Sequence, residues 1–221
     1  MRHLLPIALA AALLPLQAQA EMKTRTLSYD VEGTTVESVL VYDDGGTAKR
    51  PALVMVPNWM GVNDAQVEKA KAIAGKDYVI LVADVYGKAT RPANGDEAGK
   101  AAGAMYADRA ALRARVNAAL DQLVHAEDAP VDAAKLGAIG FCFGGATALE
   151  LARSGAPVAG VVSFHGNLGT PQPASGDSLK AKVAVTPLLK FNGARIIDLD
   201  ATMPYAEELA LAQKAVAEIL G

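Results

Sequence analysis

The chain has 221 residues, of which 52% are apolar, and its 21 Lys and Arg nearly balance 24 Asp and Glu, for a formal net charge of −3. This composition excludes an intrinsically disordered chain, and a single cysteine, Cys142, excludes a disulfide-stabilised scaffold. The slightly negative charge and the lack of any basic run argue against electrostatic binding of nucleic acid. The length fits one domain with a sizeable core.

The start of the chain predicts an export signal. Basic residues precede an apolar run at 4–14, and the small-x-small triplet Ala18-Gln19-Ala20 follows it, as signal peptidase requires. The alternative is a membrane anchor, but a span needs about 20 apolar residues and this run is shorter. We therefore expect residues 1–20 to be a cleaved signal peptide. Residues 21–221 would be a periplasmic or secreted domain without further membrane contact.

From residue 24 onward, apolar and β-branched runs alternate with stretches of helical periodicity. The runs predict strands at 24–29, 35–42, 52–56, 78–83, 136–139, 158–164 and 183–190. The periodic stretches predict helices at 64–74 with Asp64 as its N-cap, at 108–124, at 143–152 and at 204–220. In the second helix, the apolar residues that share one face are Leu112, Val116, Leu120 and Leu123.

This alternation predicts the fold class. Strands that are apolar throughout and separated by helices are typical of a parallel sheet covered on both faces. We expect one α/β domain in three layers around a mostly parallel sheet. The active site of such a sheet lies at the carboxyl ends of its strands, so the residues that follow each strand are the candidates for chemistry.

One of these strand ends carries a nucleophile motif. The sequence Gly140-Phe141-Cys142-Phe143-Gly144 follows the strand at 136–139 and opens the helix at 143–152, which is the context of a nucleophile elbow with cysteine as nucleophile. Side chains two residues before and after the nucleophile would collide with neighbouring backbone, hence the glycines. The helix N-terminus stabilises a thiolate, and the Phe143 N–H points where an oxyanion would form. The alternative is a glycine-rich turn around a buried cysteine, which the strand and helix on either side make the weaker reading.

The sequence resembles the dienelactone hydrolase family of α/β-hydrolases. The resemblance is carried by IGFCFGG at 139–145, PNWMGVND at 57–64, VADVYGK at 82–88 and VVSFHG at 161–166. It implies an α/β-hydrolase fold and hydrolysis of a small carboxylic ester or lactone by a Cys-His-Asp triad, without a cofactor. By this resemblance Cys142 is the nucleophile, and the N–H groups of Phe143 and Trp59 form the oxyanion hole.

Two positions depart from the family pattern at the expected substrate site. Asn58 stands where many members have a glutamate beside the resting thiol, so no carboxylate can take part in activating it there. Lys88 stands where some members use an arginine to bind a substrate carboxylate. Lysine can attract an anion but lacks the bidentate fork of arginine, and a solvated loop lysine is an equally good interpretation.

The acid and the base of the triad are not evident. The family places them after the nucleophile, but none of the histidines, His3, His125 and His165, lies in the last 56 residues. Asp198 and Asp200 are displaced candidates for the acid, although surface carboxylates are the simpler interpretation. His165 follows the strand at 158–164 and is a candidate base, although a structural or pocket-wall role is favoured because it belongs to the SFHG pattern. The C-terminal part is thus atypical or truncated relative to the family.

Three functions remain open from the sequence. The first is an exported hydrolase of esters or lactones, and the second is a catalytically impaired relative that binds small molecules. The third is a thiol-reactive or redox protein that uses Cys142 alone. No His or Cys cluster has metal-ligand spacing, so no metal is expected. The substrate and the oligomeric state do not follow from the sequence.

Overall fold

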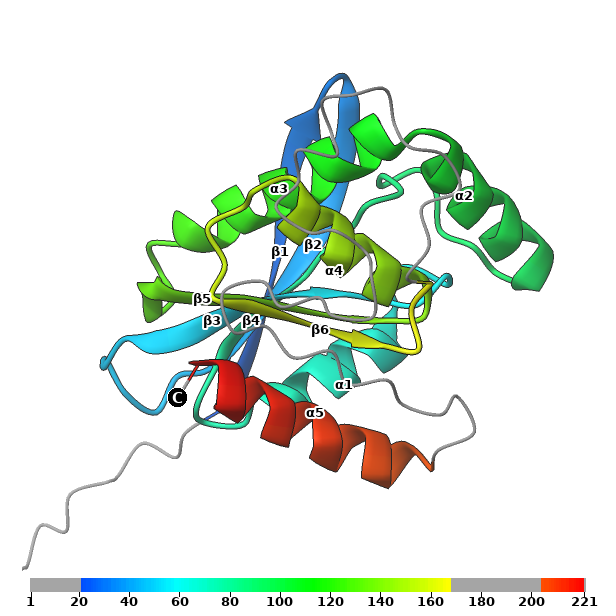
Figure 1. Ribbon diagram of the computed structural model, residues 1–221. Helices are drawn as coiled ribbons and strands as arrows, with labels where there is room; N and C mark the ends of the chain where they lie inside the picture. Colours follow the sequence, from blue (N-terminus) through cyan, green and yellow to red (C-terminus); the bar gives the residue numbers. More distant parts are fainter. Residues whose placement is uncertain (1–20, 168–203, 221) are drawn as a thin grey trace, which may run out of the picture.

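The computed structural model describes residues 21–167 and 204–220 (Figure 1). The proposed signal peptide, the expected strand at 183–190, Asp198 and Asp200 lie outside these ranges. The strands are β1 (Met22–Val31), β2 (Thr34–Asp43), β3 (Arg50–Val56), β4 (Val79–Val82), β5 (Val131–Phe141) and β6 (Gly160–Phe164). The helices are α1 (Asp64–Ala74), α2 (Gly95–Ala107), α3 (Arg109–Val124), α4 (Phe143–Arg153) and α5 (Tyr205–Leu220).

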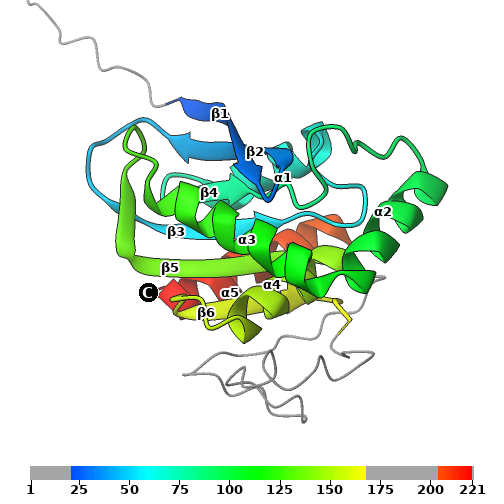
Figure 2. The ribbon, with the colours of Figure 1, turned by 90° about the horizontal axis from the view of Figure 1, so that it is seen from above.

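The strands form one mixed sheet in the order β1-β2-β4-β3-β5-β6 (Figure 2). Strands β4, β3, β5 and β6 run parallel, whereas β1 pairs with β2 and β2 pairs with β4 in antiparallel fashion. The mostly parallel sheet is therefore confirmed, with an antiparallel hairpin at one edge. The carboxyl ends of the parallel strands meet at one side of the molecule, as the expected active-site position requires.

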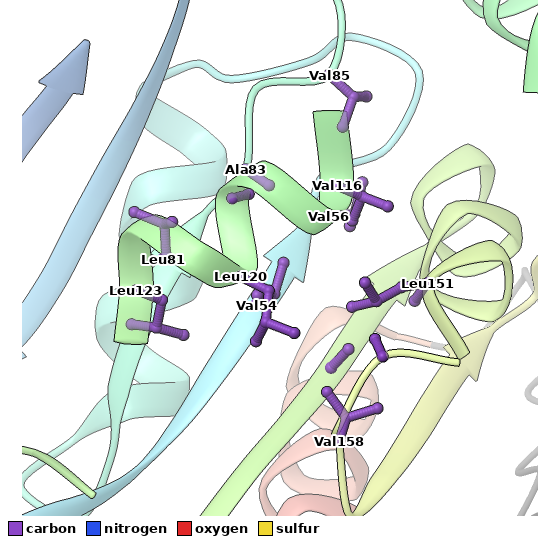
Figure 3. Close-up of a cluster of buried hydrophobic side chains, with 14 of the residues drawn as sticks. Val54, Val56, Leu81, Ala83, Val85, Val116, Leu120, Leu123, Leu151 and Val158 are labelled. Atoms are coloured by element: carbon purple, nitrogen blue, oxygen red, sulfur yellow. The ribbon is translucent and has the colours of Figure 1, made fainter. Parts of the chain in front are cut away.

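Helices cover both faces of the sheet, which gives the three expected layers (Figure 1). Successive strand residues alternate between the faces, so Leu53 and Met55 of β3 pack with α1 and α5. Val54 and Val56 pack on the other side with α3 and α4, in the cluster of Figure 3. The predicted apolar face of α3 is confirmed, because Leu112, Val116, Leu120 and Leu123 are all buried there.

The structure corrects the expected elements in three places. Helix α2 was not expected at all, and it is capped by Asn94, whose side chain accepts a hydrogen bond from Glu97 N. Strand β5 begins at Val131, five residues earlier than expected, because its amino end pairs beside Arg50 across an irregularity in β3. The N-cap of α1 is Asn63 rather than Asp64, and the Asn63 side chain accepts from Gln66 N. Among the helices within 21–167 and 204–220, none is both long and apolar enough to span a bilayer.

Candidate active site

Cys142 lies between the end of β5 and the start of α4 in a strained backbone conformation. Its φ of 54° and ψ of −118° lie outside the regions that non-glycine residues prefer, and its side chain is exposed. The turn is held from both sides, since Cys142 N donates to Phe164 O at 2.9 Å and Gly145 N donates to Cys142 O at 3.0 Å. Strain that the surrounding backbone maintains around an exposed thiol is typical of a functional site.

The two glycines of the motif are required by close backbone contacts. A Cβ atom on Gly140 would lie 2.0 Å from Gly144 O, and one on Gly144 would lie 2.1 Å from Val56 O. The expected collisions are therefore confirmed. The second contact also presses the start of α4 against the carboxyl end of β3, the strand that leads to Trp59.

The segment after β3 forms a tight turn that presents Trp59. Gly61 N donates to Asn58 O at 2.9 Å, and Met60 N donates to the Asn58 side-chain oxygen at 3.0 Å. Trp59 occupies the first central position of this turn, whose N–H a β-turn does not use in its own hydrogen bonds. Asn58, one of the two positions named at the expected substrate site, accepts hydrogen bonds that stabilise this turn.

Aromatic rings connect the Trp59 turn to the nucleophile. The Phe143 ring contacts those of Tyr86 and Tyr106, with 5.3 Å between ring centroids in both pairs. The Tyr86 hydroxyl donates to Trp59 O at 3.0 Å. The chain segments that carry the two candidate oxyanion donors, Phe143 N–H and Trp59 N–H, are thus tied together by one phenol and by the contact at Gly144.

Burial and nearby charges raise the pKa values of both phenols, Tyr86 and Tyr106. Burial chiefly raises the pKa of Tyr86, and the charges of Tyr106, Cys142 and Asp84 raise it further. Burial also raises the pKa of Tyr106, and a negative charge on Cys142 adds to that effect while Arg109 opposes it. Both hydroxyls therefore remain protonated donors at neutral pH.

His165 directs its imidazole toward α5. It follows β6 with a φ of 41°, and its Nε2 lies 3.5 Å from a Glu208 carboxylate oxygen. The other Glu208 oxygen lies 3.1 Å from Lys69 Nζ, which in turn sits 4.0 Å above the Phe141 ring. The Lys69–Glu208 ion pair thus links α1 to α5, and the imidazole of the candidate base lies beside it. His125 is exposed at the end of α3, as expected of a surface residue.

Lys88 is paired rather than free. Its Nζ lies 2.7 Å from a Glu37 carboxylate oxygen, and its side chain is 60% exposed. It lines a surface hollow of about 560 Å³ together with Thr34, Tyr86 and Gly87. The structure therefore offers Lys88 both a carboxylate partner and an open space beside it.

Several residues that support the site were not singled out from the sequence. Asp84 is buried and accepts hydrogen bonds from the N–H groups of Glu37, Tyr86 and Gly87 and from the Arg91 side chain. Its position two residues after β4 was the available signal, because strand ends were the expected place for chemistry. No group of three or more potential metal ligands occurs among the residues that the structure describes.

A second group of buried polar side chains connects α4 with α3. The fully buried carboxylate of Glu150 on α4 pairs with Arg109 and Arg113 of α3, at 2.7 and 2.6 Å, and with Arg153. Arg109 also lies 5.7 Å from the Tyr106 ring. This network ties α3 to α4, the helix that begins after Cys142, and the two helices lie too far apart in sequence for spacing alone to group its members.

Comparison with known proteins gives one family. The model of the dienelactone hydrolase family matches residues 37–214, whereas no curated protein matches the chain. The solved structure named m3DLH is 29% identical, with a TM-score of 0.72, and the match covers 90% of this chain and 99% of that one. The structure of a dienelactone hydrolase-like promiscuous phosphotriesterase, P91 from metagenomic libraries, matches with the same identity, TM-score and coverage of both chains.

A more distant structure shows the fold alone. An S-formylglutathione hydrolase from Staphylococcus aureus is 11% identical, with a TM-score of 0.56, and the match covers 91% of this chain and 98% of that one. The family match and the mixed sheet with helices on both faces show that the fold is that of an α/β-hydrolase. The chain belongs to the dienelactone hydrolase family.

Proposed function

We propose that the protein hydrolyses carboxylic esters or lactones of small molecules, with Cys142 as the covalent nucleophile. The observation that carries the proposal is the exposed thiol held at φ 54° between β5 and the N-terminus of α4. The partial positive charge of a helix N-terminus stabilises a thiolate, which is the nucleophilic form. Membership of a hydrolase family supports the same reaction class.

The proposed reaction has two half-reactions and uses no cofactor. The Cys142 thiolate attacks the ester carbonyl, and the N–H groups of Phe143 and Trp59 bind the resulting oxyanion. Collapse of this intermediate releases the alcohol and leaves a thioester on Cys142. Water then hydrolyses the thioester, and this half-reaction is slow because no histidine follows His165 in the chain.

The second candidate is a catalytically impaired relative that binds small molecules. It is favoured by that missing histidine and by the direction of the His165 imidazole, which faces Glu208. Such a protein would form no thioester. His165 as a substitute base, with Asp198 or Asp200 as the acid, remains a separate hypothesis within the hydrolase proposal.

Hydrolysis of a 4-nitrophenyl ester by the protein and by Cys142→Ser separates these candidates. We expect a burst of about one nitrophenol per chain, then slow turnover, because loss of a catalytic base costs several orders of magnitude. Cys142→Ser should show neither phase. An aryl phosphotriester serves as a second substrate, since the P91 structure is described as a promiscuous phosphotriesterase.

His165→Ala tests the role of the histidine in the same assay. Because its imidazole faces Glu208, we expect the variant to keep the burst of the unchanged protein. Sustained turnover that disappears in His165→Ala would instead identify His165 as the base. Rapid turnover that survives both Cys142→Ser and His165→Ala would contradict the hydrolase mechanism proposed here.

We also propose that the protein is exported and that its mature domain begins at Glu21. The support is the charged start, the apolar run at 4–14 and the triplet Ala18-Gln19-Ala20. N-terminal sequencing of the protein from the periplasm or medium should begin at Glu21. Recovery of soluble protein that retains Met1 would contradict export by cleavage.

A further inference from the structure

Tyr106 lies near the carboxyl end of α2 and is half-buried against the residue that follows the nucleophile. Its ring meets the Phe143 ring edge to face, with 5.3 Å between centroids and an interplanar angle of 71°. We propose that the Tyr106 hydroxyl is the proton donor to the alcohol that leaves when Cys142 is acylated. This inference rests on the proposed hydrolase function and adds a catalytic residue to it.

The two phenols beside Phe143 differ in how their hydroxyl groups are used by the residues that the structure describes. Tyr86 donates its proton to Trp59 O at 3.0 Å and so holds the turn that carries Trp59. Within 21–167 and 204–220, the Tyr106 hydroxyl takes part in no hydrogen bond. A half-buried phenol whose proton none of these described residues accepts is a donor available to a ligand.

The contact between the Tyr106 and Phe143 rings places this phenol beside the turn that carries the nucleophile. A negative charge on Cys142 is the second cause, after burial, that raises the pKa of Tyr106. The phenol is therefore fully protonated at neutral pH when the thiolate attacks. Arg109, 5.7 Å from the ring and bound to buried Glu150, steadies the end of α2 beside it.

The position of the histidines explains why a phenol is needed. His125 is exposed at the end of α3, and the His165 imidazole faces Glu208 of α5. No histidine follows in the sequence. An alkyl ester still needs a proton donor, because a departing alkoxide is strongly basic, more so than a phenolate even when burial raises the pKa of the phenol.

The step balances as follows. The Cys142 sulfur forms a bond to the carbonyl carbon, the bond from that carbon to the alkoxy oxygen breaks, and this oxygen takes the proton of the Tyr106 hydroxyl. The phenolate left on Tyr106 recovers a proton from water. The hydroxide so formed is consumed when the thioester is hydrolysed to the carboxylic acid and the thiolate.

The experiment compares two esters of the same acid in single-turnover acylation, followed by intact mass. An ethyl ester needs its leaving group protonated, whereas a 4-nitrophenyl ester does not. We expect Tyr106→Phe to slow acylation by the ethyl ester about 10²- to 10⁴-fold, and acylation by the nitrophenyl ester less than about threefold. The matched control is Tyr78→Phe, which removes a hydroxyl from a half-buried tyrosine on the α1 and α5 side of the sheet and should change neither rate.

A readout on the unchanged protein keeps the test independent of how the variant folds. If Tyr106 donates the proton, acylation by the ethyl ester slows in D₂O and acylation by the nitrophenyl ester does not. Equal losses with both esters in Tyr106→Phe would overturn the inference, as would unchanged rates or no solvent isotope effect. A protein that forms no thioester with either ester would contradict the proposed function itself, and the role of Tyr106 with it.

Discussion

Replacing Gly144 by alanine should separate the two halves of the oxyanion hole. The new Cβ atom would lie 2.1 Å from Val56 O and 2.4 Å from Pro57 O, whereas real Cβ atoms stay at least 3.0 Å away. Both contacts are with backbone, so the start of α4 and the end of β3 must move apart by 3.0 − 2.1 = 0.9 Å. Trp59 follows Pro57 by two residues and Phe143 precedes Gly144, so this shift moves the two candidate N–H donors apart.

The expected costs follow from that shift. Overpacking of this kind lowers the free energy of unfolding by about 1–3 kcal/mol. A displacement of about 1 Å between catalytic groups lowers the rate by about 10²-fold. Urea denaturation gives the first quantity, and the size and rate of the nitrophenol burst give the second.

The matched control is Gly103→Ala in α2. A Cβ atom there would meet nothing within 4 Å, so alanine should stabilise the helix by about 0.5–1 kcal/mol and leave the burst unchanged. If Gly144→Ala were as stable and as active as the control, the packing of α4 against β3 would not be what holds the site.

Three further predictions concern buried polar groups. Burial alone would favour neutral Glu150, but Arg113 and Arg153 outweigh burial and hold the pKa of Glu150 below the ordinary value of 4.5. The contribution of Glu150 to the free energy of unfolding is therefore present above pH 4.5 and is lost as the pH falls toward the lowered pKa. Unfolding free energies at pH 3–5 should consequently fall more steeply in the unchanged protein than in Glu150→Gln, and parallel curves would refute this. Burial raises the pKa of Tyr29 to about 12. The contribution of Tyr29 to the free energy of unfolding is therefore present below pH 10.0, its ordinary pKa, and is lost as the pH rises through 12. Between these two pH values, the free energy of unfolding should fall less in Tyr29→Phe than in the unchanged protein. Asp84→Ala leaves three backbone N–H groups and Arg91 without their buried acceptor and should cost about 3–5 kcal/mol, with faster amide exchange at Tyr86 and Gly87; unchanged exchange would count against this role.

The layered fold could be predicted because its signals are local and periodic. The runs around Leu53 and Ile80 are apolar throughout and lie buried on both faces of the sheet, and α3 buries the face that its spacing predicted. Helix α2 was missed because Gly95, Gly99 and Gly103 weaken its helical signal. The Asn94 and Glu97 pair at its start was a capping signal that could have revealed it.

In the candidate site, too, local features could be predicted from the sequence, whereas contacts between distant segments could not. Cys142 and its glycines lie within five consecutive residues, so the sequence alone predicts the elbow that the structure contains. Tyr86, in the loop after β4, and Tyr106, on α2, contact Phe143 at the start of α4. These contacts depend on how the elements pack, and no rule of sequence spacing describes them. Glu208, which the His165 imidazole faces, belongs to α5 and lies 43 residues later in the sequence, so their proximity could be found only in three dimensions.

Mapping the acyl group after a single turnover tests the central claim, that Cys142 is the covalent nucleophile. The protein is mixed with 4-nitrophenyl acetate, quenched in acid during the burst, and analysed by intact mass and by peptide mapping. The account predicts one acetyl group per chain on the peptide that contains Cys142, and none in Cys142→Ala. Hydrolysis without any adduct, or an adduct on another residue that persists in Cys142→Ala, would contradict it.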